Sequence, residues 1–175
     1  MILFESHATS IDNQNEKASG WLDPNLALVG LTQAQELGKR YMQDNISIIY
    51  VSDLIRSQRT AEIAFKSRNI PIIMDPRLRE WNYGEYNGYS AEQVESLKLS
   101  YIHTPFPKGE SLSDVMQRFA SFKTDNLKNL DGKIVLIIGH RATFYSMEYF
   151  FNHTPLHIVL SCKWEWLPKR MYYSS

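Results

Sequence analysis

The chain has 175 residues, of which 43% are hydrophobic and 22% charged, and these values suit one globular domain with a full core. Lys and Arg together number 19, as do Asp and Glu, so the net charge is zero and we expect neither a nucleic acid nor a membrane surface as partner. The single cysteine, Cys162, excludes an internal disulfide, and no apolar run approaches about 20 residues, so we expect a cytoplasmic protein without a transmembrane helix.

In chain order, the pattern of apolar residues predicts strands that alternate with helices. Strands are expected at residues 1–6, 46–51, 71–74 and 133–138. Helices are expected at residues 31–42, 53–66, 91–99, 111–130 and 141–152, with Ser52 and Asp53 as N-cap residues of the second. Residues 8–30, 75–90 and 102–111 are predicted to be loops, and residues 156–160 and 163–167 edge strands. This alternation predicts a three-layer α/β/α sandwich with a largely parallel sheet, in a single domain spanning residues 1–175.

Two of the predicted strands lead directly to a histidine. The first strand is followed by His7, and the apolar run at residues 134–138 is followed by Gly139 and His140. Ligands of open α/β sheets bind at the carboxyl ends of the strands. We therefore expect His7 and His140 to face each other across one site.

Six short motifs occur in a fixed order along the chain. They are His7 with Asn13, Gly20-Trp21-Leu22-Asp23, Ser52-Asp53-Leu54-Ile55-Arg56 followed by Thr60-Ala61, Arg79-Glu80 followed by Gly84 to Gly88, Gly109-Glu110-Ser111, and Gly139-His140. In this order and spacing they resemble the motifs of the histidine phosphatase superfamily, also called phosphoglycerate mutase-like. The resemblance spans nearly the whole chain. It implies phosphoryl transfer on a small phosphorylated substrate. We expect no cofactor, a monomer or homodimer, and no metal, because the acidic and histidine residues show no ligand spacing such as His-Glu-x-x-His.

The resemblance also implies roles for individual residues. His7 is the expected nucleophile, because a neutral imidazole can form a phosphohistidine and divide one displacement into two. Glu80 is the expected general acid and then base, with Trp81 and Tyr83 nearby to desolvate it. His140 is expected to stabilise charge on the transferring group, while Arg56 and Asn13 bind its oxygens.

Each of these residues also has a structural interpretation. His7 can cap a strand end, and His140 can be a core histidine with its hydrogen bonds satisfied. Arg56 can lie at the surface, and Asn13 can be an ordinary turn residue. Glu80 can be a loop carboxylate paired with Arg77 or Arg79.

The chain departs from the family pattern next to the nucleophile, where Ser6 replaces an arginine that clamps phosphate. Arg141, which replaces a glycine after His140, is the residue that we expect to supply part of the lost charge, and we include it among the phosphate-binding residues. Arg59 replaces a glutamine and is either a second clamp or a solvated side chain.

Three functions are compatible with this pattern. The first is a phosphatase that hydrolyses a small phosphomonoester through phosphohistidine on His7. The second is a phosphoglycerate mutase-type phosphoryl transfer, which ranks lower because the chain is short. The third is a degenerate member that binds a phosphorylated ligand or a partner without turnover, a possibility raised by Ser6.

Overall fold

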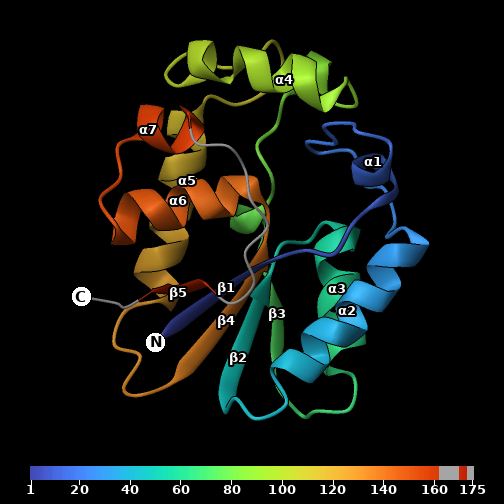
Figure 1. Ribbon diagram of the computed structural model, residues 1–175. Helices are drawn as coiled ribbons and strands as arrows, with labels where there is room; N and C mark the ends of the chain where they lie inside the picture. The colour runs from blue at the N-terminus through green and yellow to red at the C-terminus, as the bar shows by residue number, and fades with distance from the viewer. Residues whose placement is uncertain (162–169, 173–175) are drawn as a thin grey trace.

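The computed structural model describes residues 1–161 and 170–172, with no description of the side chain of Arg170. In this part of the chain a five-stranded sheet has the order β3-β2-β4-β1-β5. The strands are β1 (Ile2–Ser6), β2 (Ile46–Val51), β3 (Ile72–Met74), β4 (Ile134–Gly139) and β5 (Arg170–Tyr172). All neighbouring pairs are parallel except β1 with β5, so four strands point their carboxyl ends to the same edge (Figure 1).

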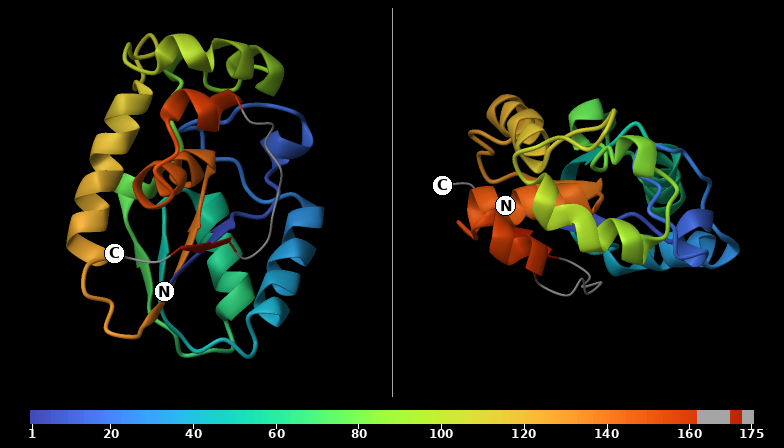
Figure 2. Two further views of the ribbon diagram at one scale, coloured as in Figure 1. Left: turned by 60° about the vertical axis from the view of Figure 1, so that its left-hand side comes forward. Right: turned by 90° about the horizontal axis from the view of Figure 1, so that it is seen from above.

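Helices cover both faces of this sheet, which confirms the predicted three-layer sandwich (Figures 1 and 2). Helices α2 (Leu28–Arg40) and α3 (Ile55–Phe65) lie on one face, and α5 (Leu112–Asn126) and α6 (Arg141–Phe151) lie on the other. The short α1 (Ile11–Gln14), α4 (Ala91–Leu97) and the 3-10 helix η3 (Lys98–Tyr101) lie beyond the carboxyl ends of the strands. The remaining elements are the 3-10 helices η1 (Pro76–Leu78) and η2 (Gly84–Tyr86), and α7 (Leu156–Ser161).

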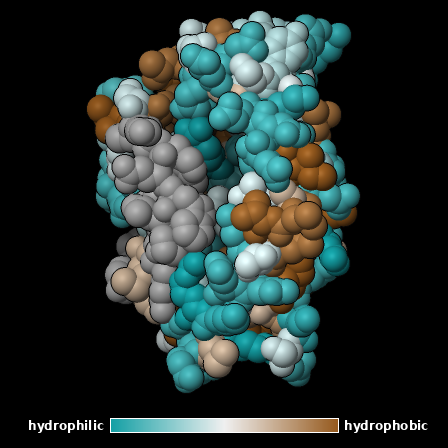
Figure 3. Space-filling model, turned by 45° about the vertical axis from the view of Figure 1, so that its right-hand side comes forward, coloured by the Kyte–Doolittle hydropathy of each residue, from teal (hydrophilic) through white to brown (hydrophobic). Residues whose placement is uncertain are grey.

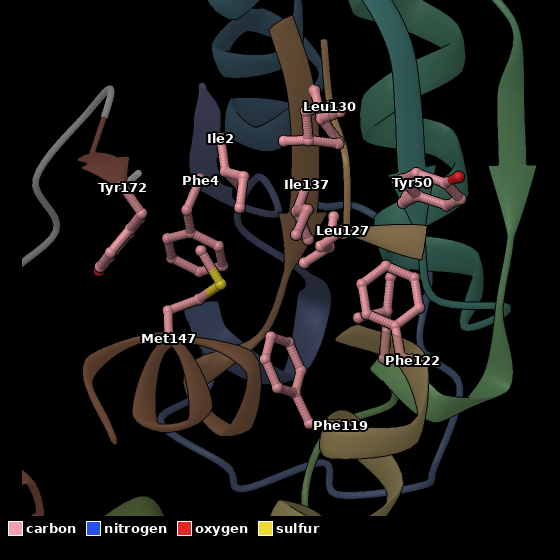
Figure 4. Close-up of a cluster of buried hydrophobic side chains, with 12 residues drawn as sticks. Ile2, Phe4, Tyr50, Phe119, Phe122, Leu127, Leu130, Ile137, Met147 and Tyr172 are labelled. Carbon is pink, nitrogen blue, oxygen red and sulfur yellow. The ribbon is translucent and has the colours of Figure 1, made fainter. Parts of the chain in front are cut away.

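The alternation of side chains along each strand gives the sheet two buried faces. Ile2 and Phe4 of β1 pack with Ile137 of β4 against Phe119 and other side chains of α5 and α6 (Figure 4). The intervening residues of the same strands, including Leu3, Leu136 and Ile138, pack against α2 and α3. In the register of β1 and β4, Ile2 pairs with Val135 and Ser6 with Gly139, so the two strands end side by side at the same edge of the sheet.

Several predicted elements differ from the structure. The predicted loop at residues 8–30 contains α1 and the first turn of α2. Neither Ser52 nor Asp53 is the N-cap of α3: that position is Leu54, and the carboxylate of Asp23 accepts from Ile55 N at 2.7 Å.

Residues 156–160 form a helix instead of an edge strand. Leu156, Val159 and Leu160 recur at helical spacing and pack together beside α5 and α6, which a strand would not allow. The predicted strand at 163–167 and Cys162 lie outside the described residues. The division into one domain over residues 1–175 stays a prediction.

Candidate active site

Strand register brings the two strand-end histidines together. Ser6 pairs with Gly139, and His7 N donates to Gly139 O at 2.9 Å. The next residue along each strand is therefore on the same edge, and the ring centroids of His7 and His140 lie 4.9 Å apart. A phosphoryl group that touches one ring is within reach of the other.

The His7 ring is held in one tautomer. Its Nδ1 lies 2.8 Å from Ala8 O, and since a carbonyl only accepts, the proton of the neutral ring is on Nδ1. Nε2 then carries the lone pair. Burial, together with the positive charge of Arg56, lowers the pKa of His7 to about 3, so the ring is neutral at physiological pH.

The backbone that follows His7 is held in place by α3. Ala8 N donates to Thr60 Oγ1 at 3.0 Å, and the same hydroxyl donates to Arg56 O at 2.7 Å. The backbone after His7 is thus tied to the first turn of α3, where Arg56 lies.

His140 is fully buried at the N-cap of α6. Its Nε2 lies 2.6 Å from Ser52 Oγ, and its buried Nδ1 has no hydrogen-bond partner among the described residues. Burial and the nearby Arg56 and His7 lower the pKa of His140 well below its ordinary value. The ring is therefore neutral.

Arg56 is only 2% exposed, which excludes the surface interpretation. Its guanidinium donates to Leu22 O and Gly20 O, both at 2.9 Å, so it anchors the loop before α2 as well as lining the cavity beside His7. Burial lowers the pKa of Arg56, while the carboxylates of Glu80 and Asp23 act to raise it. A buried guanidinium near two neutral histidines is a favourable place for an anion.

Glu80 is buried, lines both cavities beside His7 and is held by backbone donors. Its Oε1 accepts from Trp81 N at 2.8 Å and Ala142 N at 3.0 Å, and its Oε2 accepts from Arg141 N at 3.2 Å. Glu80 is not paired with either predicted arginine. Arg77 binds Asp75 and Asp125, whereas Arg79 binds Asp53.

The remaining predicted residues are divided between the cavity and the surface. Asn13 and Arg141 line the cavities at the site, with the guanidinium of Arg141 bound to Glu95 at 2.8 and 2.9 Å. The Arg59 side chain is 51% exposed and pairs with Glu62, outside both cavities. Arg59 is therefore a solvated side chain in this structure.

Two cavities meet at His7 and Glu80. The smaller, of about 100 Å³, extends from Arg56 past Tyr83 toward α4. The larger, of about 480 Å³, opens beside Ser6, Thr9 and Gln33. Hydrophilic residues dominate the upper part of the face in Figure 3, and apolar residues gather at its right-hand side.

Among the described residues, no three His, Cys, Asp or Glu side chains are grouped as a metal site, and no helix has the length and apolar character needed to cross a membrane.

Comparison with known proteins agrees with this geometry. The family model described as histidine phosphatase superfamily (branch 1) matches residues 2–162. This chain belongs to the histidine phosphatase superfamily.

Relatives in this superfamily have different activities. A 2,3-bisphosphoglycerate-dependent phosphoglycerate mutase 1 of Arabidopsis thaliana is 29% identical over 89% of this chain, which spans only 58% of that relative's length. Phosphoserine phosphatase 1 of Hydrogenobacter thermophilus is 27% identical over 83% of this chain and 73% of its own. Among solved structures, Bacillus stearothermophilus YhfR is 28% identical, with a TM-score of 0.82 over 94% of this chain and 86% of its own.

Several residues that support the site were given no individual role in the sequence analysis. Trp21 Nε1 and Arg118 Nη2 both donate to Glu80 O, at 2.8 and 3.0 Å, and so fix the backbone of the carboxylate. Gly84 lets this loop pack closely: its φ is +56°, and a Cβ there would lie 2.0 Å from Pro107 O. Trp21 and Gly84 belong to motifs that mark the superfamily, but Arg118 has no local signal, because its contacts come from distant segments.

The lowered pKa values of His7 and His140 predict acid sensitivity of the fold. As pH falls below about 6.5, the unfolded chain binds protons at these rings and the folded chain does not, so the free energy of unfolding should fall. The His7 ring should contribute a loss of about 2 kcal/mol between pH 7 and pH 5, a window in which unfolded carboxylates stay largely ionised, and His140 should add a loss in the same direction.

Urea unfolding at several pH values measures this effect. His7→Asn should make the fall in the free energy of unfolding between pH 7 and pH 5 smaller by about 2 kcal/mol, whereas His103→Asn, at an exposed position, should leave that fall unchanged. A wild-type free energy that is flat between pH 7 and pH 5 would contradict the burial of two neutral rings.

Proposed function

We propose that this chain is a phosphatase that hydrolyses a small phosphomonoester through a phosphohistidine intermediate on His7. The observation that carries the proposal is the fixed tautomer of His7, because the contact of Nδ1 with Ala8 O leaves the lone pair of Nε2 free to attack phosphorus. The ring of a second neutral histidine, His140, lies 4.9 Å away between ring centroids. The nearby Arg56 supplies positive charge for the phosphoryl oxygens.

In the first half-reaction, Nε2 of His7 attacks phosphorus, and the bond from phosphorus to the leaving oxygen breaks. Arg56 and the amide of Asn13 donate to the phosphoryl oxygens. The hydroxyl of Ser52 lies 2.6 Å from His140 Nε2 and holds that ring in place. The ring of His140, which lies beside that of His7, stabilises the charge on the transferring group.

Glu80 moves the protons of both half-reactions. Protonated Glu80 gives its proton to the leaving alkoxide, and the resulting carboxylate then takes a proton from the water that attacks phosphohistidine. The P–N bond breaks, inorganic phosphate leaves, and His7 returns to the neutral Nδ1–H form. The three backbone donors on the Glu80 carboxylate keep it at this position through both steps.

A mutase activity is the second candidate, because mutases are among the relatives at 29–30% identity. Incubation with 3-phosphoglycerate separates the two functions. A phosphatase releases inorganic phosphate and glycerate, whereas a mutase yields 2-phosphoglycerate with little free phosphate. Absence of both products, and of turnover on a range of other phosphomonoesters, would instead support a degenerate binding protein.

The proposed function also predicts how substitution of Ser6 changes activity. The guanidinium of Arg141 is engaged in two bonds to Glu95, so it is less available to replace the missing arginine than the sequence suggested. Ser6 lines the 480 Å³ cavity, which leaves room for a longer side chain. We expect Ser6→Arg to raise kcat/KM about tenfold or more, since a charged hydrogen bond contributes about 1.5–3 kcal/mol.

The matched control for this variant is Ser6→Met, which fills similar space without charge and should not raise kcat/KM. Steady-state hydrolysis of p-nitrophenyl phosphate measures all three proteins. If Ser6→Arg has no effect while Arg141→Ala lowers kcat/KM tenfold, Arg141 already supplies the charge.

A further inference from the structure

The larger cavity at the site has more room than a phosphoryl group alone requires. Its volume of about 480 Å³ lies within the roughly 300–1,000 Å³ of typical ligand pockets, and it meets the smaller cavity at His7 and Glu80. Ser6, which directly precedes the nucleophile, forms part of its wall. A group bound beside Ser6 therefore lies next to the phosphorus that His7 attacks.

The wall of this cavity is held in place by α2 and the residue before it. Thr9 N donates to Gln33 Oε1 at 2.9 Å, and Thr9 O accepts from Ala27 N at 3.0 Å. Gly30 allows the close approach of the helix, because a Cβ there would lie 2.2 Å from Thr9 O. The space beside Ser6 is therefore bounded by tightly packed backbone.

Most of the side chains around this cavity are uncharged. Besides His7, the described residues of its wall comprise four uncharged polar side chains, one carboxylate and one guanidinium, namely Ser6, Thr9, Asn13, Gln33, Glu80 and Arg141. The guanidinium of Arg141 is bound to Glu95 at 2.8 and 2.9 Å. Hydroxyl and amide groups can hydrogen-bond an uncharged ester, so this wall suits a substituent that carries no charge of its own.

The positive charge near the nucleophile is also partly offset within the protein. Arg56 is buried and lines the smaller cavity with His7. The carboxylates of Glu80, Asp23 and Asp12 all lie close enough to act on its charge. A phosphomonoester carries a charge of about −1.5 to −2 at pH 7, whereas a diester has only one ionised oxygen. A diester therefore needs less cationic charge than a monoester, and its second substituent fills the larger cavity.

We propose that this site also hydrolyses phosphodiesters, and that the cavity beside Ser6 holds the substituent that stays on phosphorus. This activity goes beyond the proposed phosphomonoesterase and rests on the same chemistry of His7. Ser6 acts as a specificity-determining residue, because its short side chain leaves the space that the second substituent occupies.

The reaction passes through the same two half-reactions as monoester hydrolysis. Nε2 of His7 attacks phosphorus, the bond from phosphorus to the leaving alkoxide breaks, and Glu80 gives that alkoxide its proton. The phosphohistidine keeps the second ester group, which lies beside Ser6. Water then attacks phosphorus, Glu80 takes a proton from the water, and the P–N bond breaks with its electron pair returning to His7. The products are an alcohol and a phosphomonoester.

Bis(p-nitrophenyl) phosphate and p-nitrophenyl phosphate test this activity, because they share a leaving group and differ only in the second aryl ester. The ratio of their kcat/KM values, diester over monoester, measures use of the cavity. Ser6→Met fills the space without charge, so it should lower the ratio about tenfold or more through loss of diester turnover. Ser6→Arg should lower the ratio about 100-fold, because it also raises monoester turnover.

Ser6→Ala is the matched control, since it keeps the space open and should leave the ratio unchanged. Methyl p-nitrophenyl phosphate is a second probe of the cavity. Its retained group is small, so Ser6→Met should reduce its turnover less than that of the diaryl ester. His7→Asn should abolish turnover of all three substrates, which assigns the diester activity to this site.

The outcomes separate the diester activity from the monoesterase function. Hydrolysis of the monoester alone by the wild-type chain overturns the diester activity and leaves the proposed function intact. Diester turnover that survives His7→Asn, or a ratio that Ser6→Met leaves unchanged, overturns the proposal as well. Turnover of the diesters without the monoester supports it and overturns the proposed function, whereas absence of turnover of all three substrates overturns both.

Discussion

His7→Asn is expected to lower kcat for phosphomonoester hydrolysis by at least about 10⁴-fold, since loss of a nucleophile in other enzymes that work through covalent intermediates has effects of that order or larger. Asn retains a donor for Ala8 O, which His7 binds at 2.8 Å, so the loop should keep its conformation. What is lost is the lone pair of Nε2, which no asparagine atom replaces.

The control for this variant is His103→Asn, at an exposed histidine whose Nδ1 lies 3.0 Å from Ser113 Oγ. It should retain full activity. The measurement is the steady-state release of phosphate from an alkyl and an aryl substrate. Substantial turnover by a folded His7→Asn protein would show that another group attacks phosphorus.

Glu80→Gln is expected to have the second-largest effect, and the size should depend on the leaving group. An alkyl phosphate needs a proton on its leaving oxygen, so we expect kcat to fall about 10²–10⁴-fold. A p-nitrophenolate leaves without help, so its departure should be nearly unaffected. Hydrolysis of the phosphoenzyme should nevertheless be slow, because Glu80 also activates water.

The expected signature is a burst of one nitrophenolate per chain, followed by slow turnover, in rapid-mixing experiments. Glu85→Gln, in the same loop but exposed and paired with Lys108, should behave like the wild type. Equal losses for alkyl and aryl substrates in Glu80→Gln, without a burst, would place the general acid elsewhere.

The two central strands and the histidines that follow them could be predicted because the local sequence pattern agrees with the packing of a parallel sheet. The runs before His7 and His140 are apolar on both faces, as central parallel strands require. Parallel neighbours end at the same edge, so two strand-end histidines are expected to meet, and the structure places them 4.9 Å apart between ring centroids. The helix predicted directly after the strand at residues 46–51 begins at the same edge of the sheet, so Arg56 in its first turn is expected there as well.

Other features depend on contacts that no local pattern reveals. A run of five apolar residues such as 156–160 suits a strand or a helix, and only packing beside α5 and α6 decides between them. Lys98 is only 3% exposed, and its ammonium lies over the rings of Tyr83 and Tyr145, which are distant in sequence. The capping of α3 by Asp23 likewise joins two segments separated by a whole helix.

The most direct test of phosphoryl transfer through His7 is to isolate the intermediate. The Glu80→Gln protein is mixed with p-nitrophenyl phosphate and quenched in alkali, which preserves the phosphoramidate bond, and the phosphorylated peptide is located by mass spectrometry. We predict one phosphoryl group per chain, on His7, and none when His7→Asn is added. Phosphate release without a phosphoryl group on His7, or phosphorylation that persists in the double variant, would contradict the mechanism.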